Sequence, residues 1–88
     1  MSYTMSYIIF DLDATDEGTE HAFEAELRKI EIDGLLWGAG GLDPSFKLLR
    51  SFQIFCFVKD DKVGDLLKEK VNALLEKKFP DIEIDAFN

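Results

Sequence analysis

Two aspartates that follow an apolar run are the residues of this 88-residue sequence with the clearest potential for chemistry. Residues 8–10 are apolar and precede Asp11 and Asp13, so a strand could present one carboxylate as a phosphoryl nucleophile and the other as an acid or base. A phosphatase of this kind also needs Mg²⁺, a downstream lysine and further acidic residues on a larger parallel sheet. The chain is too short for that site, so we interpret both aspartates as part of a solvated turn before a helix.

The other residue types that could form a catalytic or metal site have little support. An EF-hand calcium loop needs a helix on both sides, whereas a strand is expected before the carboxylates of residues 11–17. Cys56, the only cysteine, lies in an apolar run that is typical of a buried, inert thiol. His21, the only histidine, is expected on the polar side of a helix, with no serine or cysteine in a nucleophile–base pattern. We therefore expect no enzyme active site, no metal and no cofactor.

The charge and hydropathy of the chain narrow the possible partners. Ten basic and eighteen acidic residues give a formal net charge of −8, which repels phosphate backbones and argues against direct nucleic-acid binding. An RNA-recognition module would also need more basic residues near its aromatic strand than Arg50 and Lys59. Acidity instead suits a basic protein partner. Without a run of about 18 apolar residues or a secretory leader pattern, we expect a cytoplasmic protein that does not bind a membrane.

Hydrophobic periodicity predicts six elements in the order βαββαβ. Thr19 is expected to cap the first helix and Asp60 the second. Glycines 38, 40 and 41 are expected to end the second strand. Leu66 is expected to lie with Val63, Leu67, Val71, Leu74 and Leu75 in one apolar stripe of the second helix. Strands are predicted over residues 3–10, 32–37, 48–58 and 81–87, and helices over about residues 19–30 and 61–79.

This order of elements predicts a ferredoxin-like α+β fold, formed as a single domain over residues 1–88. Right-handed βαβ crossovers would place both helices on one face of a four-stranded antiparallel sheet. The other face would stay open. Alternation along the third strand places Phe55 and Phe57 on that open face, opposite Cys56 and Val58. An uncovered aromatic patch is typical of a partner surface or a dimer.

Three stretches carry a resemblance to a known family. They read DGLLWG at residues 33–38, QIFCFVKDDKVG at residues 53–64 and DAFN at residues 85–88. In this order and spacing they resemble the C-terminal guanine-nucleotide exchange domain of eukaryotic translation elongation factor 1-beta and 1-delta. The similarity covers nearly the whole chain, and packing alone would not dictate the polar residues of the middle stretch. The family's ferredoxin-like fold agrees with the fold predicted from periodicity.

The resemblance implies that the chain binds elongation factor 1-alpha and promotes release of its GDP so that GTP can bind. No bond in a substrate is broken, and other subunits of the elongation factor 1 complex are further expected partners. The implied exchange surface consists of two parts. Phe46, Lys47 and Arg50 lie before the third strand, and Phe87 and Asn88 lie at the end of the last strand.

Two departures from the family's pattern leave an alternative open. Lys47 occupies the position where the family carries an aromatic residue, although Phe46 directly precedes it. Family members also continue beyond Asn88 with a lysine that reaches toward the Mg²⁺ site of the G-protein, where a positive charge would compete with the ion. The alternative is therefore an exchange-deficient module that docks on elongation factor 1-alpha.

Overall fold

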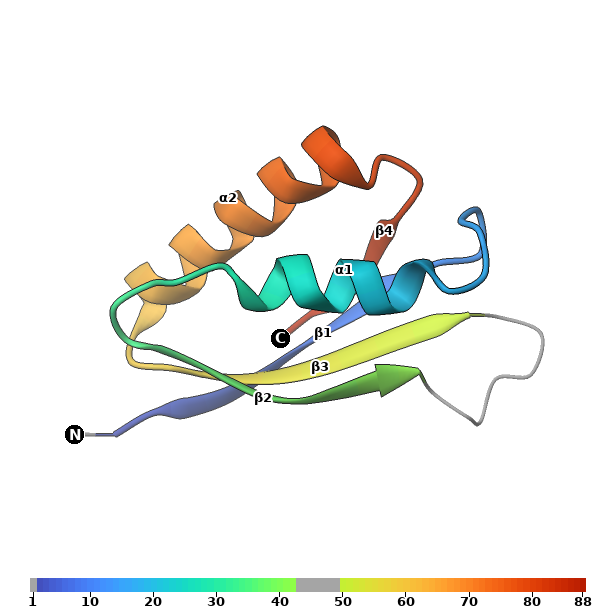
Figure 1. The fold of residues 1–88 in the computed structure, drawn as a ribbon. Coiled ribbons are helices and arrows are strands. Elements are labelled where there is room, and N and C mark those ends of the chain that lie inside the picture. Colours follow the sequence, from blue (N-terminus) through green and yellow to red (C-terminus); the bar gives the residue numbers. More distant parts are fainter. Residues whose placement is uncertain (1, 43–49) are drawn as a thin grey trace.

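The computed structural model describes residues 2–42 and 50–88 and confirms the predicted order of elements. These are β1 (Thr4–Asp11), α1 (Thr19–Arg28), β2 (Leu35–Leu42), β3 (Ser51–Val58), α2 (Asp61–Lys78) and β4 (Glu83–Phe87). The strands form one antiparallel sheet in the order β2-β3-β1-β4. Figure 1 shows α1 and α2 on the same face of this sheet, which confirms the ferredoxin-like α+β fold. Within the described ranges, neither helix has the length and apolar character needed to cross a membrane.

The two helices begin in different ways. Asp60 caps α2 as predicted, because its carboxylate accepts a hydrogen bond from the Val63 amide at 3.0 Å. The prediction that Thr19 caps α1 is wrong. Gly18 occupies the cap position with φ of 89°, a left-handed conformation that glycine adopts without strain. The Glu20 carboxylate accepts a hydrogen bond from the Gly18 amide at 3.0 Å, so the first turn is stabilised from within the helix.

The second strand lies later in the chain than predicted. The sequence predicts a strand over residues 32–37, whereas β2 runs through Leu35–Leu42 and includes the glycines that were expected to end it. A Cβ atom at Gly40 would lie 3.1 Å from the Ile54 side chain and 3.3 Å from the Phe52 ring. Glycine is needed here because the neighbouring strand and its side chains approach closely, and not because the chain turns.

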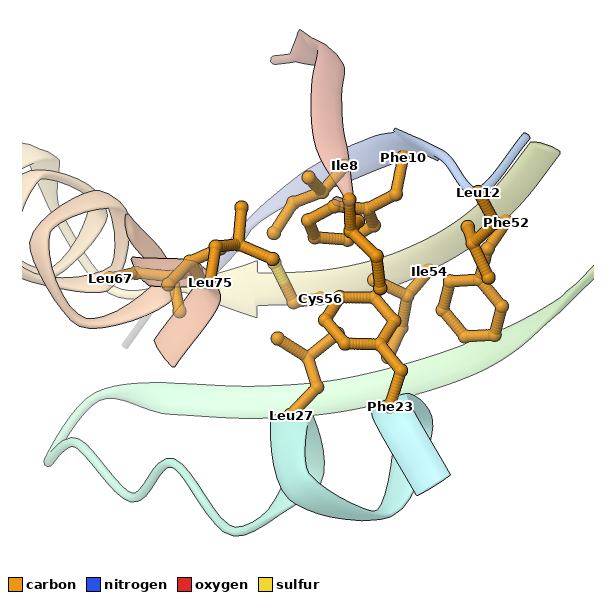
Figure 2. Packing of buried hydrophobic residues seen from close by; sticks show 12 residues of the cluster. Ile8, Phe10, Leu12, Phe23, Leu27, Phe52, Ile54, Cys56, Leu67 and Leu75 are labelled. Carbon is orange, nitrogen blue, oxygen red and sulfur yellow. The ribbon is translucent and has the colours of Figure 1, made fainter. Parts of the chain in front are cut away.

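One hydrophobic core fills the space between the sheet and the helices (Figure 2). The Phe23 ring packs edge-on against Phe10, with centroids 4.7 Å apart, and against Phe52 at 5.9 Å. Cys56 is fully buried, as predicted. Leu66 does not belong to the core, contrary to the prediction, because it lies beside the stripe that faces the sheet and is 40% exposed. The fully buried side chains are Ile8, Phe10, Leu12, Phe23, Leu27, Phe52, Ile54, Cys56, Leu67 and Val71.

The face of the sheet opposite the helices carries a patch of large apolar side chains. Met5, Phe57 and Leu36 form one row across β1, β3 and β2, because their strand positions pair directly. Tyr7 and Phe55 form the next row, with their rings edge-on and centroids 6.3 Å apart. We call these five residues the open-face patch. The predicted outward positions of Phe55 and Phe57 are thereby confirmed, and Figure 1 shows no helix over this side of the sheet.

Candidate functional site

Arg50, the predicted site residue closest to the start of β3, is held by contacts inside the molecule. Its guanidinium donates hydrogen bonds to three backbone carbonyls and one carboxylate. The carbonyls belong to Leu12, Thr15 and Asp16, at 2.6–3.2 Å, and the carboxylate belongs to Glu20, at 2.8 Å. The Arg50 side chain is only 25% exposed. Arg50 therefore anchors the start of β3 to the connection between β1 and α1 and to the first turn of α1.

The backbone of Arg50 strengthens the same attachment. Its amide donates to a carboxylate oxygen of Asp13 at 2.7 Å, and its carbonyl accepts from the Leu12 amide at 2.9 Å. The Asp11 carboxylate accepts from the Asp13 amide at 2.8 Å. The two aspartates that could have suggested phosphoryl chemistry thus accept hydrogen bonds from backbone amides in a turn.

The electrostatics of this cluster centre on Glu20. Its pKa is lower than the ordinary value for a glutamate. The largest cause is a hydrogen bond from its own backbone amide, which lowers the pKa, whereas partial desolvation raises it. A hydrogen bond and Coulombic attraction from Arg50 lower the pKa further. The carboxylate is therefore ionised at neutral pH and pairs with the guanidinium.

Phe87 and Asn88 lie where β4 ends against the middle of β1. The backbone of Asn88 pairs with Tyr7 in both directions, at 2.8 and 3.0 Å, and its side-chain amide donates to the Tyr7 hydroxyl at 2.8 Å. The Ser6 hydroxyl also donates to the Asn88 carbonyl. The Lys68 ammonium of α2 lies 5.1 Å from the centroid of the Phe87 ring, within cation–π range. The end of β4 is thus attached to both β1 and α2.

A hollow of about 490 Å³ lies beside Phe87, between the first turns of α2, the start of β1 and the end of β3. Its lining combines the carboxylates of Asp60, Asp61 and Asp65 with the ammonium of Lys68. Within residues 2–42 and 50–88, no group of histidine, cysteine, aspartate or glutamate residues is arranged to hold a metal ion. The hollow has the size and mixed polarity to accept a side chain of a protein partner.

The three predicted site residues that the structure describes, Arg50, Phe87 and Asn88, do not form one cluster. Phe46 and Lys47 lie outside the described residues. Arg50 lies just beyond the end of β1, whereas Asn88 pairs with Tyr7 in the middle of that strand. Arg50 pairs with Leu12 and Asn88 pairs with Tyr7, so about five residues of strand separate the two positions along β1, which corresponds to roughly 17 Å at about 3.3 Å per residue. A protein interface of typical size, about 800 Å² of each partner, spans this separation.

Sequence reasoning missed the residues that hold these two parts of the site. Glu20 lies 30 positions from Arg50, and Tyr7 lies 81 positions from Asn88. Local patterns contain no signal for either pair. Pairing of β4 with β1 brings Asn88 to Tyr7, and pairing of β3 with β1 brings Arg50 to the connection that leads into α1, where Glu20 lies. A glutamate in the first turn of a helix favours an interaction with the helix dipole, which does not point to Arg50 as a partner.

Known proteins resemble this chain over nearly its whole length, although no protein-family model matches it. Over 85 residues, 94% of the chain, it is 44% identical to elongation factor 1-delta of Homo sapiens and covers 30% of that protein. It is 41% identical to elongation factor 1-beta of Xenopus laevis and 40% identical to probable elongation factor 1-beta of Drosophila melanogaster, covering 37% and 38% of them. The chain thus spans about a third of the length of these relatives. The predicted resemblance is confirmed, because 94% of the chain is similar to a stretch of proteins named elongation factor 1-delta and elongation factor 1-beta.

Proposed function

We propose that this chain is a guanine-nucleotide exchange factor that promotes GDP release from translation elongation factor 1-alpha, so that GTP can bind. The observation that carries the proposal is the similarity of 94% of the chain to proteins named elongation factor 1-delta and 1-beta. These relatives are about three times longer, so the proposal assigns exchange to the stretch that they share with this chain. Other subunits of the elongation factor 1 complex are proposed as further partners, in the cytoplasm.

Such a factor acts by binding and breaks no bond in a substrate, so it is not an enzyme in the chemical sense. It must bind the nucleotide-free G-protein more tightly than the GDP-bound form. Because linkage is reciprocal, the exchange factor weakens binding of GDP to the G-protein, and GDP weakens binding of the exchange factor to the same extent. Displacing the contacts that hold Mg²⁺ and the phosphates is the step that the factor has to stabilise.

Support for this proposal from the described residues is that one sheet holds Arg50 beside the start of β3 and Phe87 and Asn88 at the end of β4. Residues 43–49 contain Phe46 and Lys47 and are followed directly by Arg50, which is anchored by four side-chain hydrogen bonds. Phe87 and Asn88 lie on the other side of β1 from β3, next to the hollow at the start of α2. The separation of roughly 17 Å along β1 between Arg50 and Asn88 suits simultaneous contact with two regions of one G-protein.

The test is release of a fluorescent GDP analogue from elongation factor 1-alpha, in the presence of excess unlabelled GTP and substoichiometric chain. We expect each chain to accelerate several release events. A stable complex without acceleration would indicate the docking module instead, and the absence of both binding and acceleration would reject the proposal.

Substitutions of Phe46 and Lys47 test the predicted exchange surface residue by residue. Phe46→Ala and Lys47→Ala are each expected to slow exchange, whereas Leu66→Ala, an exposed position on the flank of α2, is the matched control. If Lys47→Ala abolishes exchange and Phe46→Ala leaves it unchanged, the assignment of the contact residue is wrong by one position.

A further inference from the structure

The open-face patch is a feature of the described surface that the proposed function has not used. Met5 is 61% exposed, Leu36 is 54% exposed and Phe57 is 36% exposed, and these three side chains lie in one row. The Tyr7 and Phe55 rings extend the row toward the centre of the sheet. Contiguous exposed apolar side chains of this kind usually mark an interaction surface.

The charges of the sheet indicate what kind of surface fits this patch. The four strands contain no lysine, arginine or histidine. Asp11 and Glu83 pair directly across β1 and β4, and alternation along β1 places Asp11 on the same face as Tyr7. On its Tyr7 side the patch therefore has an acidic margin formed by Asp11 and Glu83, and no strand contributes a basic side chain, although the exposed Lys59 follows Phe57 by two positions after the end of β3. A complementary partner surface has an apolar centre and a basic rim.

The patch is also continuous with the predicted exchange surface. The side-chain amide of Asn88 donates to the Tyr7 hydroxyl at 2.8 Å, and the Tyr7 ring packs edge-on against Phe55. A partner that contacts Asn88 at the end of β4 thus already reaches the edge of the open-face patch. Contact with Phe57 needs only an extension across the neighbouring strand, since adjacent strands lie about 4.8 Å apart.

We propose that the open-face patch binds elongation factor 1-alpha, as an extension of the exchange surface from Asn88, at an apolar area with a basic rim. This inference rests on the proposed function and adds the open-face patch to the predicted exchange surface. A second copy of the chain fits less well, because two acidic margins and two net charges of −8 would repel each other.

The test compares the affinity of the wild-type chain and its variants for nucleotide-free elongation factor 1-alpha, by titration calorimetry, together with GDP release. Leu36→Ala combined with Phe57→Ala removes two exposed side chains without opening the core, and Leu66→Ala removes one of similar exposure from α2. We expect the double variant to bind about tenfold or more weakly, as when a central interface residue is truncated. The control is expected to bind within about twofold of wild type.

A charge series at a single position tests the basic rim separately. Leu36→Lys and Leu36→Glu remove the same side chain but add opposite charges, so differences in folding largely cancel. We expect the lysine variant to bind more weakly than the glutamate variant, with the difference shrinking as salt rises. Equal affinities of the two variants would overturn the basic-rim part of the proposal.

The remaining outcomes separate this inference from the proposed function. If wild type binds and the folded double variant binds equally well, the open-face patch is not part of the interface, while the proposed function stands. If wild type neither binds nor accelerates release, both fail. If sedimentation shows a wild-type dimer that the double variant abolishes, a second copy covers the patch and the inference is overturned. Thermal unfolding of each variant confirms that it is folded at the assay temperature.

Discussion

Replacing Arg50 by alanine tests whether this residue stabilises the fold or serves mainly to contact a partner. The substitution removes four side-chain hydrogen bonds, three to backbone carbonyls and one to the Glu20 carboxylate. It leaves the backbone hydrogen bonds of Arg50 with Leu12 and Asp13 in place. The expected loss therefore reflects the guanidinium alone.

The magnitude follows from the number of bonds and from their exposure. Hydrogen bonds to a charged group contribute about 1.5–3 kcal/mol when they are well shielded, whereas an exposed ion pair contributes about 0–1 kcal/mol. Arg50 is a quarter exposed, and water can reach some of the carbonyls that it leaves. We expect a loss of about 2 kcal/mol in the free energy of unfolding. For a domain of this size, that lowers the melting temperature by roughly 10 °C.

The assay is urea and thermal unfolding followed by circular dichroism. Arg50→Lys should lose about half as much stability, because one ammonium cannot replace the planar fork of the guanidinium. Lys78→Ala is the control, since Lys78 forms an exposed ion pair with Glu26 at 3.2 Å and its removal should change stability by less than about 0.5 kcal/mol. If Arg50→Ala is no more destabilising than this control, the anchoring role is wrong. Loss of exchange in Arg50→Lys at unchanged stability would instead indicate direct contact with the partner.

Three further predictions follow from other parts of the structure. Because folding lowers the pKa of Glu20, the contribution of its carboxylate to the free energy of unfolding is complete above the ordinary value of 4.5 and is lost as pH falls through the folded-state pKa. In urea unfolding at a series of pH values, the free energy of unfolding of Glu20→Gln should therefore fall less steeply on the acid side than that of wild type, and equal pH dependence of the two proteins would contradict this. Gly34→Ala should lower the free energy of unfolding by about 1–2 kcal/mol, since φ of Gly34 is 94° and the new Cβ would lie 3.0 Å from the Lys59 side chain. Gly64→Ala, in open space on α2, should instead raise the free energy of unfolding by up to about 0.5 kcal/mol, and equal effects of the two substitutions would refute the strain argument. Burial raises the pKa of the Cys56 thiol, although a hydrogen bond with Ser6 opposes this, so a thiol reagent at pH 8 should react with the native chain far more slowly than with the chain in urea; comparable rates would show that the thiol is accessible.

The fold could be predicted from the sequence where its determinants are local. Alternation along β3 separates the buried Phe52 and Cys56 from the outward Phe57, because successive side chains of any strand point to opposite faces. The cap at Asp60 depends on an amide only three residues away. Such relations are present in a short window of sequence, so periodicity and residue type were sufficient to predict them.

The boundaries that failed depend on neighbours that no short window contains. The glycine at position 40 looks like the end of a strand in the sequence, yet it allows β2 to pass close to Ile54 of β3. Leu66 fits an apolar stripe by spacing, but the flat sheet contacts only the narrower band that includes Leu67. Whether an apolar residue is buried depends on the shape of the surface packed against it, which periodicity does not specify.

The sequence by itself determined the order of elements, the open aromatic face and the resemblance to elongation factor 1-beta and 1-delta, since each depends on residue types and spacing along the chain. Only the tertiary structure decided how the predicted site residues are used. It joins Arg50 to Glu20 inside the molecule and Asn88 to Tyr7 at the edge of the open-face patch. Asn88 reaches Tyr7, 81 positions away, because β4 pairs with β1, whereas Arg50 reaches Glu20, 30 positions away, because β3 pairs with β1 and α1 follows β1 on the helical face of the sheet.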